Sequence, residues 1–390
     1  MPILDALRMA LYMLWEIFWA LCLGFLISAA VQAVVTKGEM QKLLPDSSPK
    51  SMLKACGLGA ASSSCSYAAT AIAKSLFKQG ADFTASIGFE VASTNLVLEI
   101  GILLFLLLGW QFMAAEALGG LVLVFLIAIL FRLFLSPKLV DGARSQVEKG
   151  LQGRMEGHAA MDMSVDPTQG SLLKRLFSAE GLTATSHYFV MDLASVWVDI
   201  AVGLLIAGAL AAWVPSSFWN ALFLTHRSQL VQSVWSALVG PLVAMASFVC
   251  SVGNVPLAAV LWKGGISFGG VVSFMLADLI IPPILNIYRR YYGAKMMVFL
   301  LCTLYAAMVV AGLLVDGIFS AAGLVPVQRV VADFSEGPRL NYTAVLNAAF
   351  LVIGVFLGVR FFRTDGKMML AMMEDAPGSD HCSSGASSGT

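Results

Sequence analysis

The chain has 390 residues, of which 58% are hydrophobic and only 12% are charged. An average soluble domain carries about a quarter charged residues, so this composition excludes an ordinary soluble globular protein. The net charge is zero, which gives no sign of a nucleic-acid or polyanion partner.

Apolar runs of about 20 residues, enough to cross the hydrocarbon core of a bilayer, recur along the chain. The first run follows a start without a basic segment, so we interpret it as a retained span and not as a signal peptide. We predict an all-α, multi-pass membrane protein with about seven to nine transmembrane helices. The runs cover residues 6 to 35, 83 to 108, 112 to 135, 188 to 213, 229 to 262, 267 to 288, 294 to 315 and 343 to 362.

The apolar runs divide the chain into four predicted parts. Residues 1–135 are predicted to form a first transmembrane repeat, and 136–185 a polar cytoplasmic loop. Residues 186–363 form a second repeat with a final span, and 364–390 a Gly/Ser-rich tail that we expect to be disordered. The loop segment SLLKRLF (171–177) fits a short amphipathic helix on the membrane, but a solvated linker is the interpretation that we favour.

Lys and Arg gather in four clusters, near residues 37–54, 138–175, 289–295 and 360–367. Basic loops of membrane proteins face the cytoplasm. All four clusters can do so only if residues 52–78 and 229–262 each enter and leave on the same side. We therefore predict two interrupted or re-entrant hairpins in a protein of the cell inner membrane, since both segments carry the Gly, Ser or Pro typical of broken helices.

The two hairpins are related in sequence. Residues 65–92 align without gaps with residues 250–277, and the charge clusters place the hairpins on opposite sides, which predicts two inverted repeats. Interrupted segments at matching positions of two halves mark the binding site of secondary transporters. The identical pairs are Cys65/Cys250, Ser66/Ser251, Ala73/Ala258, Leu76/Leu261, Lys78/Lys263, Gly80/Gly265, Phe83/Phe268, Phe89/Phe274 and Ala92/Ala277.

The second hairpin reads Cys250-Ser-Val-Gly-Asn-Val-Pro256, with Lys-Gly-Gly from residue 263. This pattern resembles the core motif of the predicted permeases of the ArsP/YraQ type, and the resemblance covers roughly residues 10 to 360. The first hairpin keeps Cys65-Ser66 but has Ala68 and Ala71 in place of the glycine and the proline. The resemblance implies a secondary transporter similar to exporters of trivalent organoarsenicals, a cargo that binds thiolates.

The candidate substrate-binding residues are small, polar or sulfur-bearing side chains of the two hairpins. Cys65 and Cys250 would offer soft ligands to a soft cargo. Close helix packing explains the same small residues without any cargo. The full set is Ser64, Cys65, Ser66, Cys250, Ser251, Gly253, Asn254 and Pro256.

Acidic residues inside a membrane are costly and often mark the pathway of a proton or ion. Glu90 and Asp278 fall near mid-membrane in the helix after each hairpin, and Glu99 lies further along the first of these helices. We predict that Glu90, Glu99 and Asp278, with Asn95 beside them, couple transport to protons or cations. Hydrogen bonding between helices is the alternative role of such residues.

Three other functions remain open at this point. An uncoupled, channel-like facilitator would share the spans, and a membrane scaffold would bind a partner through the 136–185 loop. An intramembrane enzyme with Cys65 as nucleophile needs a base and an oxyanion site that are not legible here, so we expect no enzyme and no catalytic residue. The expected partners are a small-molecule or ion substrate and the lipid bilayer, with a homo-oligomer left open; we expect no cofactor and no metal site.

Overall fold

The computed structural model describes residues 2–34, 46–62, 66–78, 80–148, 172–247, 251–329, 342–364 and 366–368. Within these residues the regular elements are all helices, which confirms the all-α prediction. Five of the described helices are long and apolar enough to cross a membrane, and two bent pairs raise this number to seven. The five are Phe83–Leu108, Trp110–Phe134, Gln229–Ser247, Ala294–Ala321 and Thr343–Arg363; the pairs are Leu4–Trp15 with Ile17–Ile27 and Phe268–Ile280 with Pro282–Tyr292.

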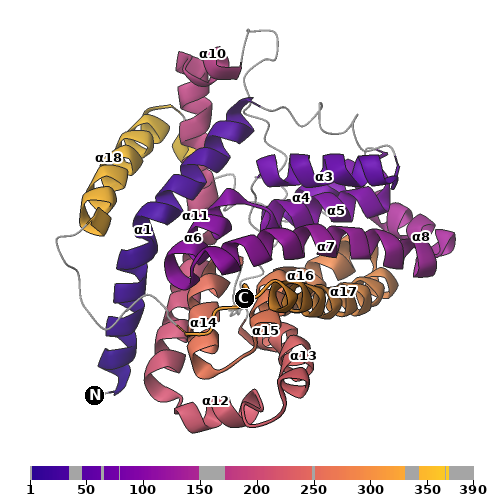
Figure 1. Cartoon of the computed structure of the whole chain (residues 1–390). Helices are drawn as coiled ribbons and strands as arrows, with labels where there is room; N and C mark the ends of the chain where they lie inside the picture. The colour runs from indigo at the N-terminus through magenta and orange to yellow at the C-terminus, as the bar shows by residue number, and fades with distance from the viewer. Residues whose placement is uncertain are drawn as a thin grey trace, which may run out of the picture.

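Three long helices pack together on one side of the molecule (Figure 1). They are α1 (Pro2–Val34), α11 (Ala179–Trp213) and α18 (Tyr342–Arg363). Helix α6 (Leu98–Leu108) contacts α1, and α14 (Ser251–Gly264) contacts α11, so these two helices join this group to the rest of the chain.

The remaining helices form two sets with the same order along the chain. In the first set, α3 (Pro49–Ser62) and α4 (Ser66–Lys78) precede α5 (Phe83–Asn95), α6 and α7 (Trp110–Phe134). The second set is α13 (Gln229–Ser247), α14, α15 (Phe268–Met275), the 3-10 turn η2 (Leu276–Ile280), α16 (Pro282–Tyr292) and α17 (Ala294–Ala321). Helix α7 packs against α17, which brings the two sets together.

Each predicted hairpin contains two described helices, α3 and α4 in the first and α13 and α14 in the second. Residues 63–65 and 248–250, which include Ser64, Cys65 and Cys250, lie outside the described residues, so the interruption of each hairpin stays a prediction. In each hairpin the second helix ends at a glycine with positive φ, Gly80 (+102°) and Gly265 (+110°). These two glycines have the same separation along the chain as Cys65 and Cys250. The match in sequence is therefore also a match in local backbone conformation.

The helix that follows each turn begins with the same type of cap. The Asp82 side chain accepts a hydrogen bond from Ala85 N at the start of α5, and Ser267 accepts one from Gly270 N at the start of α15. Such caps satisfy backbone N–H groups that have no partner inside the helix. Each of these helices then breaks near its end, after Asn95 in the first set and at Ile281-Pro282 in the second.

Small residues let the helices of each set approach closely. A Cβ atom on Gly59 of α3 would lie 2.6 Å from Phe89 O and 2.7 Å from Ala92 Cβ of α5. A Cβ atom on Gly240 of α13 would lie 2.6 Å from Ser273 Oγ and 2.7 Å from Gly270 O of α15. The first helix of each set is thus held backbone to backbone against the third.

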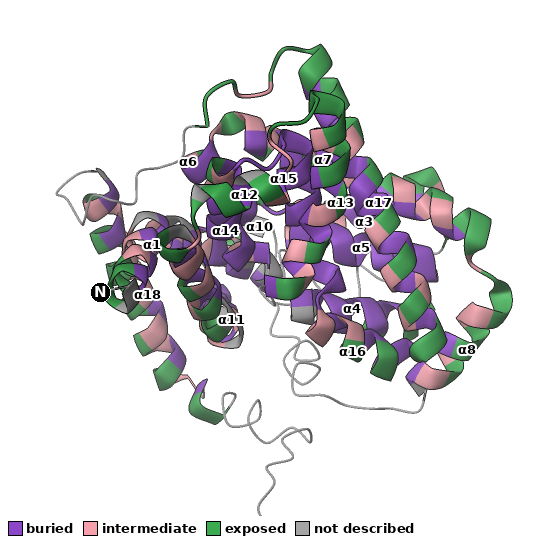
Figure 2. Ribbon diagram, turned by 90° about the horizontal axis from the view of Figure 1, so that it is seen from below, coloured by how far each residue is buried: buried purple, intermediate pink, exposed green. Residues whose placement is uncertain are grey.

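The helices differ in how far their residues are buried (Figure 2). All residues of α5, α15 and η2 are buried, although their sequences include acidic, amide and hydroxyl side chains. Helix α18 instead exposes large apolar side chains such as Leu351, Val352 and Val355. An exposed apolar helix face is stable in lipid, whereas the polar groups of α5 and η2 lie where neither lipid nor bulk water reaches them.

The segment predicted as a 136–185 loop contains helices. Helix α8 (Pro137–Glu148) follows α7, α10 covers Leu172–Leu176, and α11 begins at Ala179. Residues 172–176 are therefore helical, while the choice between a membrane-surface helix and a solvated linker stays a prediction. Residues 149–171, and the tail except for Thr364 and Gly366–Met368, lie outside the described residues.

Candidate functional site

Asp278 lies at the centre of the helical sets, fully buried in η2. The backbone of Ala277 is non-helical (φ −93°, ψ 16°), which interrupts the helix beside this aspartate. Ser66 Oγ of α4 donates a hydrogen bond of 2.7 Å to Asp278 Oδ2, and Asn95 Nδ2 of α5 lies 3.5 Å from Oδ1. An aspartate of the second set of helices is thus bound by side chains of the first set.

Glu90 of α5 is also fully buried and forms a second polar contact between the repeats. Its Oε1 atom accepts hydrogen bonds from Thr70 Oγ1 of α4 (2.6 Å) and from the Tyr288 hydroxyl of α16 (2.7 Å). Its Oε2 atom is buried without a hydrogen-bond partner in the described part of the chain. Buried polar atoms without a partner are rare, and this one lies next to the binding partners of Asp278.

Helix α4 positions these contacts through its helical period. Ser66, Thr70 and Lys74 are four residues apart and therefore share one face of the helix. Ser66 contacts Asp278 and Thr70 contacts Glu90, while Lys74 Nζ lies 4.0 Å from the centre of the Tyr291 ring. One face of α4 thus presents its polar groups to η2, α5 and α16.

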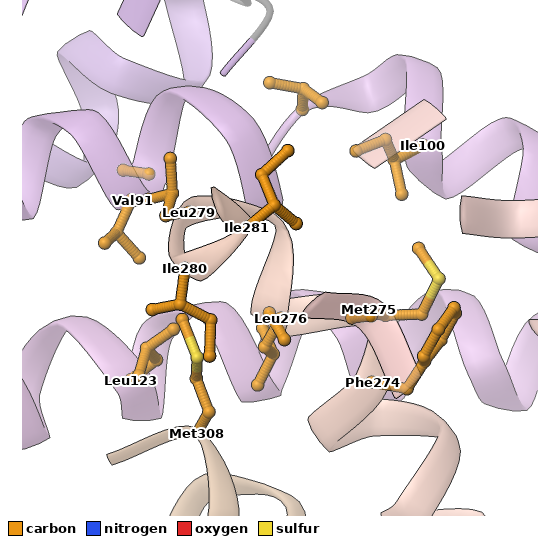
Figure 3. Close-up of a cluster of buried hydrophobic side chains, with 14 of the residues drawn as sticks. Val91, Ile100, Leu123, Phe274, Met275, Leu276, Leu279, Ile280, Ile281 and Met308 are labelled. Carbon is orange, nitrogen blue, oxygen red and sulfur yellow. The ribbon is translucent and has the colours of Figure 1, made fainter. Parts of the chain in front are cut away.

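Buried apolar side chains gather around η2, the 3-10 turn that contains Asp278 (Figure 3). In the described part of the chain, the hydrogen bonds to Asp278 and Glu90 come from hydroxyl and amide groups and not from Lys, Arg or His. An isolated carboxylate in such surroundings is costly, so hydrogen bonds or a bound proton must stabilise it. The labelled side chains include Val91, Leu123, Leu276, Leu279, Ile280 and Met308.

Glu116 of α7 is a further acid near this centre. It is buried, its Oε1 atom has no partner among the described residues, and the charge of Asp278 acts on it. A Cβ atom on Gly120, one turn further along α7, would lie 3.5 Å from Asn95 Cβ. The rule that selected Glu90 in the sequence applies equally to Glu116, which our prediction omitted.

Glu99 takes a separate position. It is buried, and a Cβ atom on Gly24 of α1 would lie 2.6 Å from Glu99 Cβ, so the side chain fills the space that this glycine leaves open. The charge of Asp192 of α11 acts on it. No hydrogen bond among the described residues joins Glu99 to Glu90 or Asp278, so the structure does not bring the three predicted coupling acids together.

The second-half motif lies in α14. Ser251, Gly253, Asn254 and Pro256 are all buried. Both side-chain polar atoms of Asn254 have no partner in the described part of the chain, and no hydrogen bond there joins this motif to the acids. No group of three His, Cys, Asp or Glu residues that could hold a metal ion occurs among the described residues.

Comparison with known proteins agrees with this architecture. Residues 3–317 match the family model ArsP_1, which is described as "Predicted permease". The chain belongs to this family. A protein of Mycobacterium tuberculosis named "Putative permease Rv2963" is 55% identical over 352 residues, which cover 89% of this chain and 85% of the relative. No solved structure matches.

Membership in this permease family confirms the resemblance seen in the sequence. Together with the apolar helices it establishes a multi-pass membrane protein of the transporter class. The intramembrane enzyme with Cys65 as nucleophile is disfavoured by this membership.

Thr70 and Tyr288 are the polar contacts that the sequence did not reveal. Thr70 lies one helical turn after Ser66, so the helical period of α4 was a usable signal. Tyr288 precedes Arg289 and Arg290 near the end of an apolar run, where tyrosines are common at membrane interfaces. Its contact with Glu90 depends on the packing of α16 against α4, which no local pattern predicts.

Tyr288→Phe should lower the maximal rate of transport by about tenfold or more, because a hydrogen bond to a charged group contributes about 1.5–3 kcal/mol. Phenylalanine keeps the ring, so the fold should remain. The measurement is the initial rate of solute uptake into proteoliposomes. Tyr305→Phe is the matched control, since the Tyr305 hydroxyl donates to Leu238 O away from the acids. Equal effects of the two substitutions would contradict a role for Tyr288.

Proposed function

We propose that this permease is a proton-coupled secondary transporter that moves a small neutral or anionic solute across the cell inner membrane. By its resemblance to organoarsenical exporters, we propose a thiol-reactive solute, with efflux as the direction. The two helical sets would be inverted repeats that meet at Asp278 and Glu90. These two carboxyl groups would carry the coupling protons.

The observation that supports coupling is the bonding of Asp278 and Glu90 across the repeats. Ser66 and Thr70, both on α4, bind one acid each, and both acids are fully buried without a cationic partner in the described chain. When both are charged, the two carboxylates repel one another. Protonation of either one relieves this repulsion, so proton binding and the packing of α4 are linked.

Through Thr70, protonation of Glu90 would change the hydrogen bonds of α4. Its Oγ1 atom lies 2.7 Å from Ser66 O and 2.6 Å from Glu90 Oε1, yet a hydroxyl has a single proton to donate. When Glu90 is charged, it accepts the Thr70 proton. When Glu90 is protonated, it can donate to Thr70, which then donates to Ser66 O. Loading Glu90 would thus change the hydrogen bonds of α4 next to Ser66, the partner of Asp278.

The proposed chemistry of the solute depends on the predicted hairpin breaks. Thiolates and hydroxyls are suitable ligands for a soft, trivalent arsenical. Ser64, Cys65 and Cys250 belong to the predicted breaks in the sequence, and Ser251, Gly253 and Asn254 follow Cys250 in α14. The buried amide of Asn254, unpaired among the described residues, supports a polar contact with the solute in this segment.

The test is transport into proteoliposomes with and without an imposed pH gradient. Monomethylarsenite, sulfite and Zn²⁺ serve as probes, each with the native protein and with Cys65→Ser and Cys250→Ser. We expect accumulation of monomethylarsenite against its gradient when the lumen is acidic, with loss of affinity in both serine variants. Flux that follows the solute gradient alone, whatever the pH difference, would instead support the uncoupled facilitator.

A further inference from the structure

Each set of helices contains a sharp turn where its second helix meets its third. We define the first elbow as residues 76–78 and 80–83, and the second elbow as residues 261–268. In the first elbow, Gly80 N donates to Phe77 O (3.1 Å) and Ala81 N donates to Leu76 O (3.0 Å). In the second elbow, Gly265 N donates to Trp262 O (3.2 Å) and Ile266 N to Leu261 O (3.2 Å). Both have the hydrogen-bond pattern that ends a helix at a glycine.

An arginine lies on each elbow. The Arg329 guanidinium lies 4.3 Å from the centre of the Trp262 ring, and the Arg144 guanidinium lies 4.7 Å from the centre of the Phe77 ring. Arg144 and Arg329 have the same separation along the chain as Phe77 and Trp262, and as the two glycines. This contact between a cation and an aromatic ring thus occurs at matching positions along the chain, after each set of helices.

The two contacts differ in strength. Arg329 also donates to three carbonyl oxygens of the second elbow, those of Trp262 (2.5 Å), Ile266 (2.8 Å) and Gly265 (3.2 Å). A planar guanidinium can reach several acceptors at once, and these three carbonyls lie at and just after the end of α14, where Gly265 O also accepts from Gln232 Nε2 (2.8 Å). Arg144 of α8 has no hydrogen bond to its elbow in the described chain. Arg329 therefore holds its elbow more firmly than Arg144 does.

Aromatic residues of the opposite repeat pack against each elbow. The Phe112 ring of α7 packs against the Trp262 and Phe268 rings of the second elbow, with 5.0 Å and 4.8 Å between ring centres. The Tyr292 ring of α16 packs against the Phe77 and Phe83 rings of the first elbow, with 6.2 Å and 5.3 Å between ring centres. Each elbow is therefore held by an arginine that follows its own set of helices along the chain, and it is packed by a ring of the other set, so a movement of one elbow disturbs both sets.

The elbows are also connected to the buried acids. Helix α4 runs from Ser66 to the first elbow, and α5 runs from that elbow to Glu90 and Asn95. Helix α15 starts at the second elbow and leads into η2 with Asp278. Because helices are stiff, displacement of an elbow is transmitted to the acid at the other end of its helix.

We propose that Arg144 and Arg329 are a pair of positioning residues that hold the two elbows closed, and that the elbows open in alternation. The alternation rests on the proposed transport function, whereas the holding contacts do not. Packed interfaces switch between discrete arrangements, so weakening one contact shifts the population toward the state in which that elbow is open. In that state the opposite elbow is closed.

Hydrogen exchange of the purified protein without any solute tests this proposal. In Arg329→Ala, amide exchange at Gly265 and Ile266 should become about tenfold faster, since hydrogen bonds to a charged group are lost. Exchange at Gly80 and Ala81 should become slower. Arg329→Lys should show the same pattern, because a point charge cannot span three carbonyls. In Arg144→Ala, exchange should become faster at Gly80 and Ala81 and slower at Gly265 and Ile266, with smaller changes than in Arg329→Ala. Arg363→Ala removes an exposed charge at the end of α18 and should change exchange at neither elbow.

Faster exchange at one elbow with no slowing at the other would overturn the alternation, and so would faster exchange at both. If an alanine variant unfolds, exchange rises along the whole chain, and Arg329→Lys and Arg144→Ala then decide the question. Slower exchange at the opposite elbow in a protein that shows no proton-driven transport would contradict the proposed function and leave the pairing intact. Proton-driven transport without slower exchange at the opposite elbow would overturn the alternation and leave the proposed function intact.

Discussion

Asp278→Asn is expected to abolish accumulation of monomethylarsenite driven by a pH gradient, while exchange of solute across the membrane at equal pH continues. Asparagine keeps the size of the side chain and can still accept from Ser66 Oγ, which lies 2.7 Å from Asp278 Oδ2. It cannot bind or release a proton near neutral pH. A transporter whose coupling group is fixed in a neutral state retains solute movement but loses the link to the proton gradient.

The measurement compares two rates in the same proteoliposomes, namely concentrative uptake under a pH gradient and counterflow without one. We expect a loss of at least about a hundredfold in the first, equivalent to roughly 2.7 kcal/mol, and less than about threefold in the second. Asp316→Asn is the matched control, because Asp316 is also a buried aspartate but lies beside Gly269 near the end of α17. Retained concentrative uptake in Asp278→Asn would contradict proton coupling at this residue.

Gly59→Ala is expected to destabilise the protein by about 1–3 kcal/mol, the range for overpacking of a tight contact. The new methyl group would lie 2.6 Å from Phe89 O and 2.8 Å from Ser93 N, both of which belong to the backbone of α5. Backbone atoms cannot move aside as a flexible side chain can, so α3 must shift away from α5. The measurement is thermal unfolding in detergent, with tryptophan fluorescence as the signal.

Gly57→Ala is a matched control only two residues away on the same helix. No heavy atom lies within 4 Å of a Cβ built on Gly57. Alanine there should stabilise the protein slightly, by about 0.5–1 kcal/mol, because the unfolded chain loses conformational freedom without a clash in the folded one. If the two substitutions lower the melting temperature equally, the loss reflects helix α3 in general and not its close contact with α5.

Hydrophobic run length and the repeated motif predicted much of the fold. Runs 83–108, 112–135 and 294–315 appear as long apolar helices, and the alignment of Gly80 with Gly265 corresponds to two turns with the same backbone conformation. These features depend on local composition. The orientation of each repeat across the membrane depends on the lipid and stays a prediction.

The candidate site was predicted less completely. Ser66, Asn95 and Asp278, which the sequence singled out as polar residues at membrane depth, are joined by hydrogen bonds, and Glu90 is buried on the same helix as Asn95, while their roles in binding and coupling stay predictions. Glu99 satisfies the same criterion but packs against Gly24 of α1, far along the fold from α4. Which acid meets which hydroxyl is decided by the packing of α4, η2 and α16, and a single sequence does not encode that in any short pattern.

The exchange of aromatic rings between the repeats has a consequence for biosynthesis. Phe77 and Phe83 of the first elbow pack against Tyr292, which the ribosome adds long after the first repeat has left the exit tunnel. Until α16 is inserted, these rings lack their contact with Tyr292, and Glu90 lacks the Tyr288 hydroxyl. The first set of helices therefore reaches its full packing only after the second set has been synthesised.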